Sequence, residues 1–336
     1  MTIQLTATPA SPGTDRSLRR FEDIRDLLPD VDNPTPLVRV PRLLPDQRFY
    51  LKLEWLNPFG SIKDRAAASL LAGLEERDEI QGRELVEASS GNTAIALAAL
   101  AALSGINLTV TIPDGVPEEK KVLLRMLGAE VWPTPDDLCP VDHPKDGAIA
   151  LARSLAASED GRRYVMPNQY ENPDNVRAHY ETTGPEIWRQ TSGEVRAFYA
   201  GFGTCGTITG VGRYLKEQDP SIQVIAVAPQ PGHRIPGLKN FTEAKEPPIL
   251  DWGIVDRVIT VDDDPAYAMT KRLHREEALI VGPSTGAIVH AASELGSVPG
   301  IAVGVSPDSG VKYTSYFAEI LSKEDLTQAI DERKRP

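Results

Sequence analysis

The chain reads Glu-Ala-Ser-Ser-Gly-Asn-Thr over residues 87–93, and this stretch decides the fold because a strand-like run gives way to a helix-like run within one short polar loop. The run that follows, Thr93 to Ser104, is apolar on every side, which predicts a helix buried between a sheet and other helices. Parallel sheets bind ligands at such strand-to-helix loops. The stretch therefore predicts a ligand-binding loop in an α/β fold.

Strand-like and helix-like runs alternate on both sides of this loop. The strand-like runs cover residues 49–53, 84–87, 108–112, 196–199, 223–228 and 301–305. The helix-like runs begin at Ser61, Thr93, Pro117, Lys145, Gly206, Pro265 and Thr285. This alternation predicts mainly parallel sheets flanked by helices. A length of 336 residues favours two such α/β domains, with a boundary near residues 167–173.

Composition excludes several classes of function. A formal net charge of -12, without a basic stripe, argues against binding to nucleic acid or to an anionic membrane. The two cysteines, Cys139 and Cys205, and the five histidines have no spacing typical of a disulfide framework or a metal site. The first ten residues lack a signal-peptide pattern, and the longest apolar run, residues 94–103, is too short to span a bilayer. We expect a cytoplasmic protein without metal.

A second stretch reads Asn-Pro-Phe-Gly-Ser-Ile-Lys-Asp-Arg over residues 57–65. A lysine amine condenses with an aldehyde only when it is unprotonated, so a reactive lysine needs surroundings that lower its pKa. Taken alone, Lys63 is also typical of a solvated lysine in the first turn of a helix capped by Ser61. Opposite the polar loop at residues 87–93, it indicates a lysine-bound pyridoxal phosphate site instead.

Two further loops are rich in glycine. Residues 201–207, Gly-Phe-Gly-Thr-Cys-Gly-Thr, fit the dinucleotide pattern G-x-G-x-x-G, but the next strand ends in Pro-Gln where a ribose-binding acid is expected. The loop is therefore predicted to hold a single phosphate at a helix start. Residues 281–287, Val-Gly-Pro-Ser-Thr-Gly-Ala, are also typical of an ordinary helix cap. Cys205 is expected to be a small filler, because no histidine lies near it in the sequence.

Together these segments resemble the fold-type II pyridoxal-phosphate enzymes, which are tryptophan synthase β-like, and in particular their cysteine synthase and cystathionine β-synthase branch. The resemblance runs from about residue 33 to residue 317 and rests on residues 33–37, 61–65, 90–93, 168–173, 183–187 and 308–313. It implies a smaller mobile α/β domain over residues 54–167, which carries the substrate carboxylate loop. Residues 34–53 with 168–322 then form a larger domain that binds the cofactor phosphate, between an N-terminal arm (1–33) and a charged tail (323–336).

The resemblance also implies roles for individual residues. Lys63 would hold pyridoxal 5'-phosphate as a Schiff base and then move the substrate α-proton. The other implied cofactor contacts are Asn92 on the ring 3'-oxygen, Gly203, Thr204, Cys205, Gly206 and Thr207 on the phosphate, and Ser284 at the pyridine nitrogen. The implied substrate carboxylate contacts are Ser89, Ser90, Gly91, Thr93 and Gln169. A neutral hydroxyl at the pyridine nitrogen suits β-elimination better than transamination.

The implied activity is that of a cysteine synthase, a sulfhydrylase that replaces the activated hydroxyl of O-acetylserine or O-phosphoserine by sulfide through an α-aminoacrylate. The implied partners are a small-molecule amino acid, sulfide or another thiol donor, and a second copy of the chain in a homodimer. Cystathionine β-synthase-like or S-sulfocysteine-type replacement and a serine or threonine β-eliminating lyase remain alternatives. A non-catalytic protein that binds a partner's C-terminal peptide is a third class, which the presence of Lys63 disfavours.

The chain departs from the family pattern at three places. Ala94 and Cys205 stand where glycine is usual, and residues 232–240 lack the Gly-Ile-Gly run of many O-acetylserine enzymes. The leaving group therefore stays open between acetate and phosphate. Arg234 or Lys239 is a candidate for pairing with a substrate phosphate, although each is also typical of a solvated surface cation.

Overall fold

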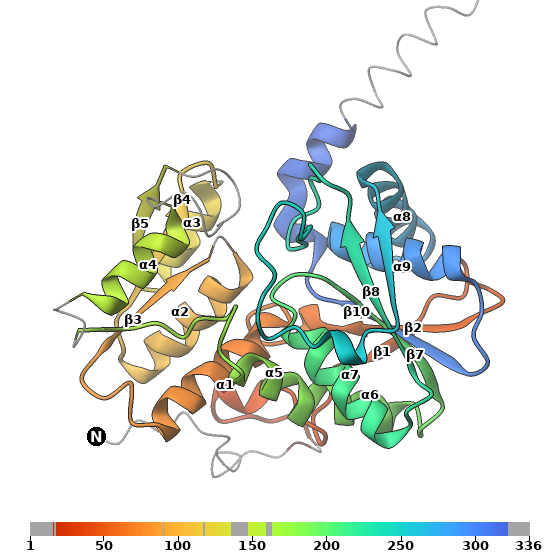
Figure 1. The fold of residues 1–336 in the computed structure, drawn as a ribbon, viewed down its shortest axis with the longest axis horizontal. Coiled ribbons are helices and arrows are strands. Elements are labelled where there is room, and N and C mark those ends of the chain that lie inside the picture. Colours follow the sequence, from red (N-terminus) through yellow and green to blue (C-terminus); the bar gives the residue numbers. More distant parts are fainter. Residues whose placement is uncertain are drawn as a thin grey trace, which may run out of the picture.

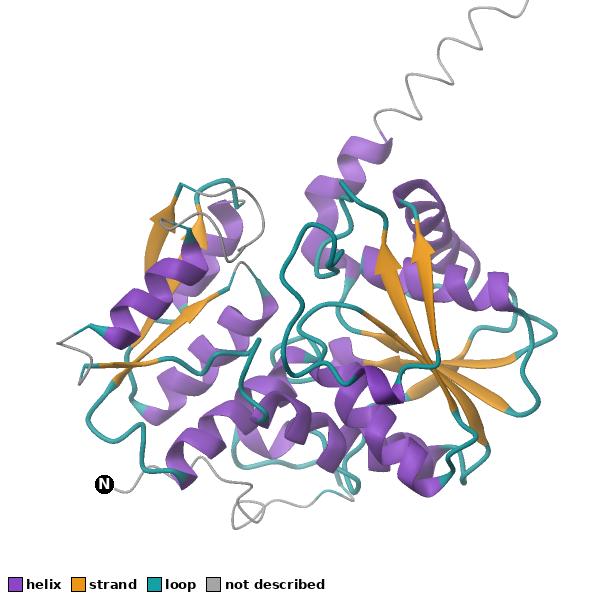
Figure 2. Cartoon of the chain, viewed as in Figure 1, coloured by secondary structure: helices purple, strands orange, loops and turns teal. Residues whose placement is uncertain are grey.

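The computed structural model describes residue 16 and residues 18–89, 91–116, 118–135, 147–158 and 163–321. These residues form two mainly parallel sheets, each flanked by helices (Figures 1 and 2), which confirms the predicted fold class. The expected positions Ser90, Pro117, Cys139 and Lys145 and the charged tail lie outside the described residues. Within the described part, no helix is both long and apolar enough to cross a bilayer.

The larger sheet has six strands in the order β1-β2-β10-β7-β8-β9. Their bounds are β1 Leu37–Arg39, β2 Arg48–Leu53, β10 Ile301–Ser306, β7 Val195–Gly201, β8 Gln223–Pro229 and β9 Arg257–Val261. Only the pairing of β1 with β2 is antiparallel. Because successive side chains of a strand point to opposite faces, the neighbours Phe198 and Tyr199 of β7 belong to two different cores.

Helices cover both faces of this sheet. On the Tyr199 side lie α8 (Asp263–Glu276) and α9 (Pro283–Leu295), and on the Phe198 side lie α6 (Gly184–Gln190) and α7 (Gly206–Gln218). All six residues of β10 are buried, as expected for a central parallel strand that is covered on both faces. The sheet therefore gives a rigid support to the loops at its carboxyl edge.

The smaller sheet has four parallel strands in the order β5-β4-β3-β6. Their bounds are β5 Glu130–Thr134, β4 Leu108–Pro113, β3 Glu84–Ala88 and β6 Tyr164–Val165. One face packs against α1 (Lys63–Glu76), α2 (Asn92–Ser104) and α3 (Glu118–Met126), and the other against α4 (Ala148–Ala157). Most of α2 is buried, which confirms the prediction for this apolar helix.

A fully buried ionic cluster joins α1 to the larger sheet. Arg65 of α1 donates to Glu54 (Nε to Oε2, 2.7 Å) and to Glu186 of α6 (Nη2 to Oε2, 2.8 Å). Lys52 of β2 donates to the same oxygen of Glu186 (2.7 Å). Two cations and two carboxylates therefore balance inside the protein, and they fix the helix that begins with Lys63.

The predicted elements agree with the structure except at their ends and in the shortest pieces. All six predicted strands are present, and the helices predicted to begin at Ser61, Pro265 and Thr285 begin two residues away, at Lys63, Asp263 and Pro283. The elements not predicted include β1, β6, β9, the short helix α5 (Asp174–Ala178), the π-helical turn η3 (His179–Thr183) and α6. β1 and β6, with three and two residues, are too short to show a period, whereas β9 and α6, with five and seven residues, are not explained by length. The ranges of the two domains stay a prediction.

Candidate functional site

The structure brings Lys63 into contact with a glycine-rich loop of the other sheet. Lys63 is the first residue of α1, and its backbone N–H donates to Ser61 Oγ (3.2 Å). Its Nζ donates to Thr204 Oγ1 (3.1 Å), in the loop between β7 and α7. Burial lowers the pKa of Lys63 to about 8, while the charge of Asp308 opposes this shift. A larger fraction of the amine is therefore neutral near neutral pH than in an exposed lysine.

The loop at residues 201–207 has a geometry typical of loops that bind small anions. It leads into the N-terminus of the 13-residue helix α7, whose first N–H groups have no acceptor within the helix. A Cβ at Gly203 would lie 2.8 Å from the carbonyl oxygen of Gly237, and one at Gly206 would lie 2.1 Å from Asn175 Oδ1. Only glycine therefore permits this close packing around the loop.

Cys205 lies inside this loop with a left-handed backbone (φ 67°), which is uncommon for a residue other than glycine. Its side chain is buried in the core below α7. Burial raises the pKa of its thiol to about 12, so the sulfur stays protonated and is a poor nucleophile.

Two buried side chains that the sequence analysis did not single out support the loop from below. Asn175 donates through Nδ2 to Thr204 Oγ1 (3.0 Å) and to the carbonyl of Gln169 (2.7 Å). His179 contacts Thr207 Oγ1 through Nε2 (3.2 Å) and Thr183 through Nδ1 (3.0 Å). Burial lowers the pKa of His179 to about 3, so the ring is neutral at physiological pH. The only local signal was their position next to the Asn168–Pro173 segment.

The polar loop that follows β3 lies against Gln169. Thr93 Oγ1 donates to Gln169 Oε1 (2.6 Å), and Ser89 Oγ accepts the N–H groups of Gly91 (3.4 Å) and Ala94 (3.2 Å). The start of α2 and Gln169 therefore form one surface of small polar groups. Ser90, which was predicted to share it, lies outside the described residues.

Ser284 is a buried residue in the first turn of α9. The segment before it pairs with residues 308–309, through the Val281–Ser309 bridge, and Asp308 in turn pairs with Ser61. A Cβ at Gly282 would lie 2.2 Å from Asp308 Oδ1, so these segments are in direct contact. The start of α9 therefore lies in the same region as the start of α1.

Asn92, the first residue of α2, is bonded at both ends of its amide. Its Nδ2 donates to Asp308 Oδ2 (2.7 Å), and its Oδ1 accepts from Lys312 Nζ (2.8 Å). Tyr313 OH donates to the same oxygen of Asp308. Burial raises the pKa of Asp308, while hydrogen bonds from Tyr313 and Asn92 favour the carboxylate. The sequence resemblance includes residues 308–313 but implies no role for them.

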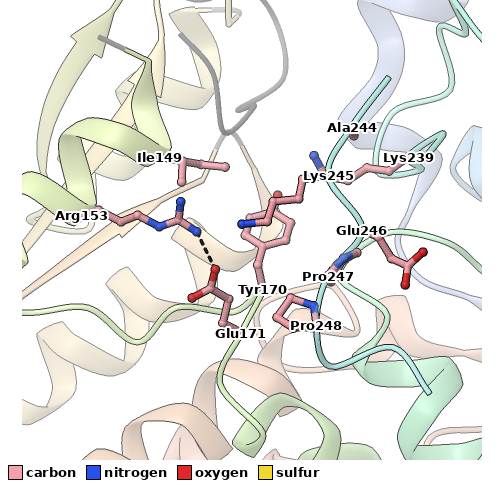
Figure 3. A pocket seen from close by; sticks show the side chains of 10 residues that line it. All are labelled: Ile149, Arg153, Tyr170, Glu171, Lys239, Ala244, Lys245, Glu246, Pro247 and Pro248. Carbon is pink, nitrogen blue, oxygen red and sulfur yellow. Dashed lines mark hydrogen bonds and ion pairs between the residues drawn. The ribbon is translucent and has the colours of Figure 1, made fainter. Parts of the chain in front are cut away.

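Arg234 and Lys239 have different surroundings. Arg234 is mostly exposed and pairs with both carboxylate oxygens of Glu319 (2.9 and 2.6 Å). The backbone N–H of Lys239 donates to the carbonyl of Phe202 (2.7 Å), so this residue lies beside the glycine-rich loop. Figure 3 shows Lys239 in a pocket with Arg153 and Lys245. The pocket lies between α4 and the segment at residues 239–248, and its lining also includes Glu171 and Glu246, the first of which accepts from Arg153 (2.6 Å).

These groups fit pyridoxal phosphate. A lysine amine with a lowered pKa, an anion-binding loop and a neutral hydroxyl are the donor set that the cofactor requires. Asn175 Nδ2 donates to Thr204 Oγ1 (3.0 Å), which fixes the position of this hydroxyl in the loop that would hold the phosphate. Among the described residues, no cluster of three potential metal ligands exists.

Comparison with known proteins agrees with this description. A model of the family described as "Pyridoxal-phosphate dependent enzyme" matches residues 28–305. Cysteine synthase B of Salmonella typhimurium is 41% identical over 286 residues, which cover 84% of this chain and 92% of that protein. Cysteine synthase of Aquifex aeolicus is 39% identical over 314 residues, which cover 89% of this chain and 94% of that protein.

Solved structures of similar enzymes share this fold. The crystal structure of O-ureido-L-serine synthase superposes with a TM-score of 0.78 at 32% identity, over 88% of this chain and 94% of the other. O-Acetyl Serine Sulfhydrylase isoform 3 from Entamoeba histolytica superposes with a TM-score of 0.77 at 28% identity, over 90% and 92% of the two chains.

Proposed function

Because the chain belongs to the family of pyridoxal-phosphate-dependent enzymes, we propose that it is a cysteine synthase, which replaces the activated hydroxyl of an O-activated serine by sulfide. The observation that carries the proposal is the contact between Lys63 Nζ and Thr204 Oγ1 (3.1 Å), which joins the reactive amine to the anion-binding loop. Relatives named cysteine synthase that align over most of this chain support the same activity.

In this proposal Lys63 is the acid and base of the reaction. The chemistry that bound pyridoxal phosphate would supply is withdrawal of electrons from the substrate Cα, which would make the Cα proton acidic and let acetate or phosphate leave from Cβ. The Lys63 amine takes that proton. The Cβ–O bond breaks, the Cβ–S bond to sulfide forms, and Lys63 returns the proton to Cα. A pKa of about 8 suits a group that must both accept and donate.

The remaining predicted contacts divide between the two sheets. Residues 203–207 would hold the cofactor phosphate, Asn92 its 3'-oxygen, and Ser284 its pyridine nitrogen. The substrate carboxylate would bind to the start of α2 and Gln169, where Ser89, Gly91 and Thr93 lie together. Backbone N–H groups and the N-terminal end of a 13-residue helix favour an anion there.

For the leaving group, the pocket in Figure 3 supports phosphate as a second candidate beside acetate. Lys239 lies beside the phosphate loop and lines the pocket with Lys245, whereas Arg153 of the same pocket is paired with Glu171 (2.6 Å). Arg234 is a weaker candidate, because Glu319 already occupies both ends of its guanidinium. O-phosphoserine is therefore proposed as an alternative substrate, with Lys239 as its contact.

Three further properties follow from the resemblance and belong to the proposal. They are a homodimer, a cytoplasmic location and a smaller domain, residues 54–167, that moves when substrate binds. Sedimentation of the purified protein tests the first, and a comparison of free and substrate-bound crystals tests the last.

The test supplies the purified protein with pyridoxal phosphate, sulfide and either O-acetylserine or O-phosphoserine, and measures cysteine. We expect cysteine from at least one substrate and none with the K63A variant. A protein that binds the cofactor but makes no cysteine from either substrate would contradict the proposal. Release of pyruvate from serine without sulfide would support the lyase instead.

A further inference from the structure

The amide of Asn92 is held between two charged residues of the other sheet. Asn92 begins α2, whereas Asp308 and Lys312 follow β10. Asp308 Oδ2 accepts from Nδ2 (2.7 Å), and Lys312 Nζ donates to Oδ1 (2.8 Å). The start of a helix from the smaller sheet is therefore attached to a segment of the larger sheet through one side chain.

The two partners allow only one orientation of this amide. An ammonium group only donates hydrogen bonds, and a carboxylate only accepts them. Rotating the amide by 180° would place the Nδ2 group against Lys312 and Oδ1 against Asp308, which sets donor against donor and acceptor against acceptor. Nδ2 carries two hydrogens, of which Asp308 takes one, and the Tyr313 hydroxyl also interacts with this amide, so the direction of the second N–H is fixed as well.

The carboxylate of Asp308 is itself held in place. Its side chain is buried, its Oδ2 accepts from Tyr313 OH as well as from Asn92, and its backbone carbonyl accepts from the N–H of Gly282 (3.1 Å). Charge-assisted hydrogen bonds of this kind are about twice as strong as neutral ones. The support behind Asn92 is therefore rigid.

We propose that Lys312 and Asp308 are positioning residues that orient the amide of Asn92 so that its second N–H donates to the 3'-oxygen of pyridoxal phosphate. This inference rests on the proposed function. Both residues act through Asn92. Neither is assigned a contact with the substrate.

The test is a double-mutant cycle on cofactor affinity. Pyridoxal phosphate is titrated into the cofactor-free forms of the wild type, K312M, N92A and the double variant, and binding is followed by visible absorbance. The loss of one charge-assisted hydrogen bond weakens binding by about ten-fold. We therefore expect K312M to bind pyridoxal phosphate about ten-fold more weakly than the wild type. In the N92A background the same substitution should have no further effect, because its target is gone.

Lys120 provides a matched control. Its pKa is lowered by burial and raised by Asp308, so K120M removes a second cation that interacts with the same carboxylate. Its Nζ lies 5.7 Å from the centre of the Tyr313 ring rather than on Asn92. We expect K120M to keep the wild-type affinity and K312R to recover most of the loss, since arginine keeps a cationic donor. Thermal unfolding of the cofactor-free proteins identifies any variant that fails to fold, and K312A, which also lacks the donor, serves if K312M does not fold.

Two results would overturn the inference alone. In the first, K312M binds pyridoxal phosphate with the wild-type affinity. In the second, the effects of N92A and K312M on the free energy of binding add in the double variant. A wild-type protein that binds no pyridoxal phosphate would overturn the inference together with the proposed function.

Discussion

Removing Glu186 from the buried ionic cluster tests how the helix of Lys63 is held. The E186A variant leaves Arg65 and Lys52 facing a single carboxylate, Glu54, at positions with no exposure to solvent. Breaking a buried pair in this way costs about 3–5 kcal/mol, because a charge stays buried without a partner. A typical protein has a free energy of unfolding of about 5–15 kcal/mol, so E186A should lose roughly a fifth of it or more.

Urea unfolding followed by circular dichroism measures this loss. The double variant K52M/E186Q is the control, because it removes one charge of each sign at similar volume and leaves Arg65 paired with Glu54. We expect it to regain at least about 2 kcal/mol relative to E186A, since no charge is then left over. A cost below about 1 kcal/mol in E186A, or a double variant as unstable as E186A, would show that the cluster does not balance charge in this way.

Three other predictions concern the site. The K63A variant should lose the visible absorbance of bound pyridoxal phosphate and lower cysteine formation by at least about 10³-fold, measured by spectrophotometry and by product assay. The rate at which the cofactor-free protein captures pyridoxal phosphate, measured by stopped flow, should rise with pH and level off above about pH 8. The reason is that burial lowers the pKa of Lys63 to about 8 and only the neutral amine reacts. A rate that continues to rise past about pH 10 would contradict this. K239A should raise the KM for O-phosphoserine and leave that for O-acetylserine unchanged, whereas R234A, which loses only an exposed pair with Glu319, should change neither.

The sequence predicts the parts of this protein that depend on local chemistry. Glycines and small hydroxyl residues at strand ends identify the loops at residues 89–93 and 201–207, because few other residues permit such turns next to an anion. Alternating apolar runs give both sheets and most helices. Lys63 was predicted from its position opposite one of these loops, and its contact with Thr204 spans 141 residues of sequence.

Other parts of the site have no local signal. Asn175 and His179 lie in short helical turns without a periodic pattern, and their importance comes only from contacts with Thr204 and Thr207. The partners Asn92 and Lys312 are 220 residues apart in the chain. Pairings of this kind depend on how the two sheets meet, and the hydrophobic pattern of the sequence does not specify this.

The left-handed backbone at Cys205 means that the loop should tolerate either cysteine or glycine at this position. An L-residue other than glycine costs about 1 kcal/mol in this conformation, yet its buried sulfur and methylene recover about the same amount by filling the core. Glycine at this position would remove both the conformational cost and the gain from burying the side chain. Exchange between the two residues is therefore expected to be nearly neutral for the stability of the folded state.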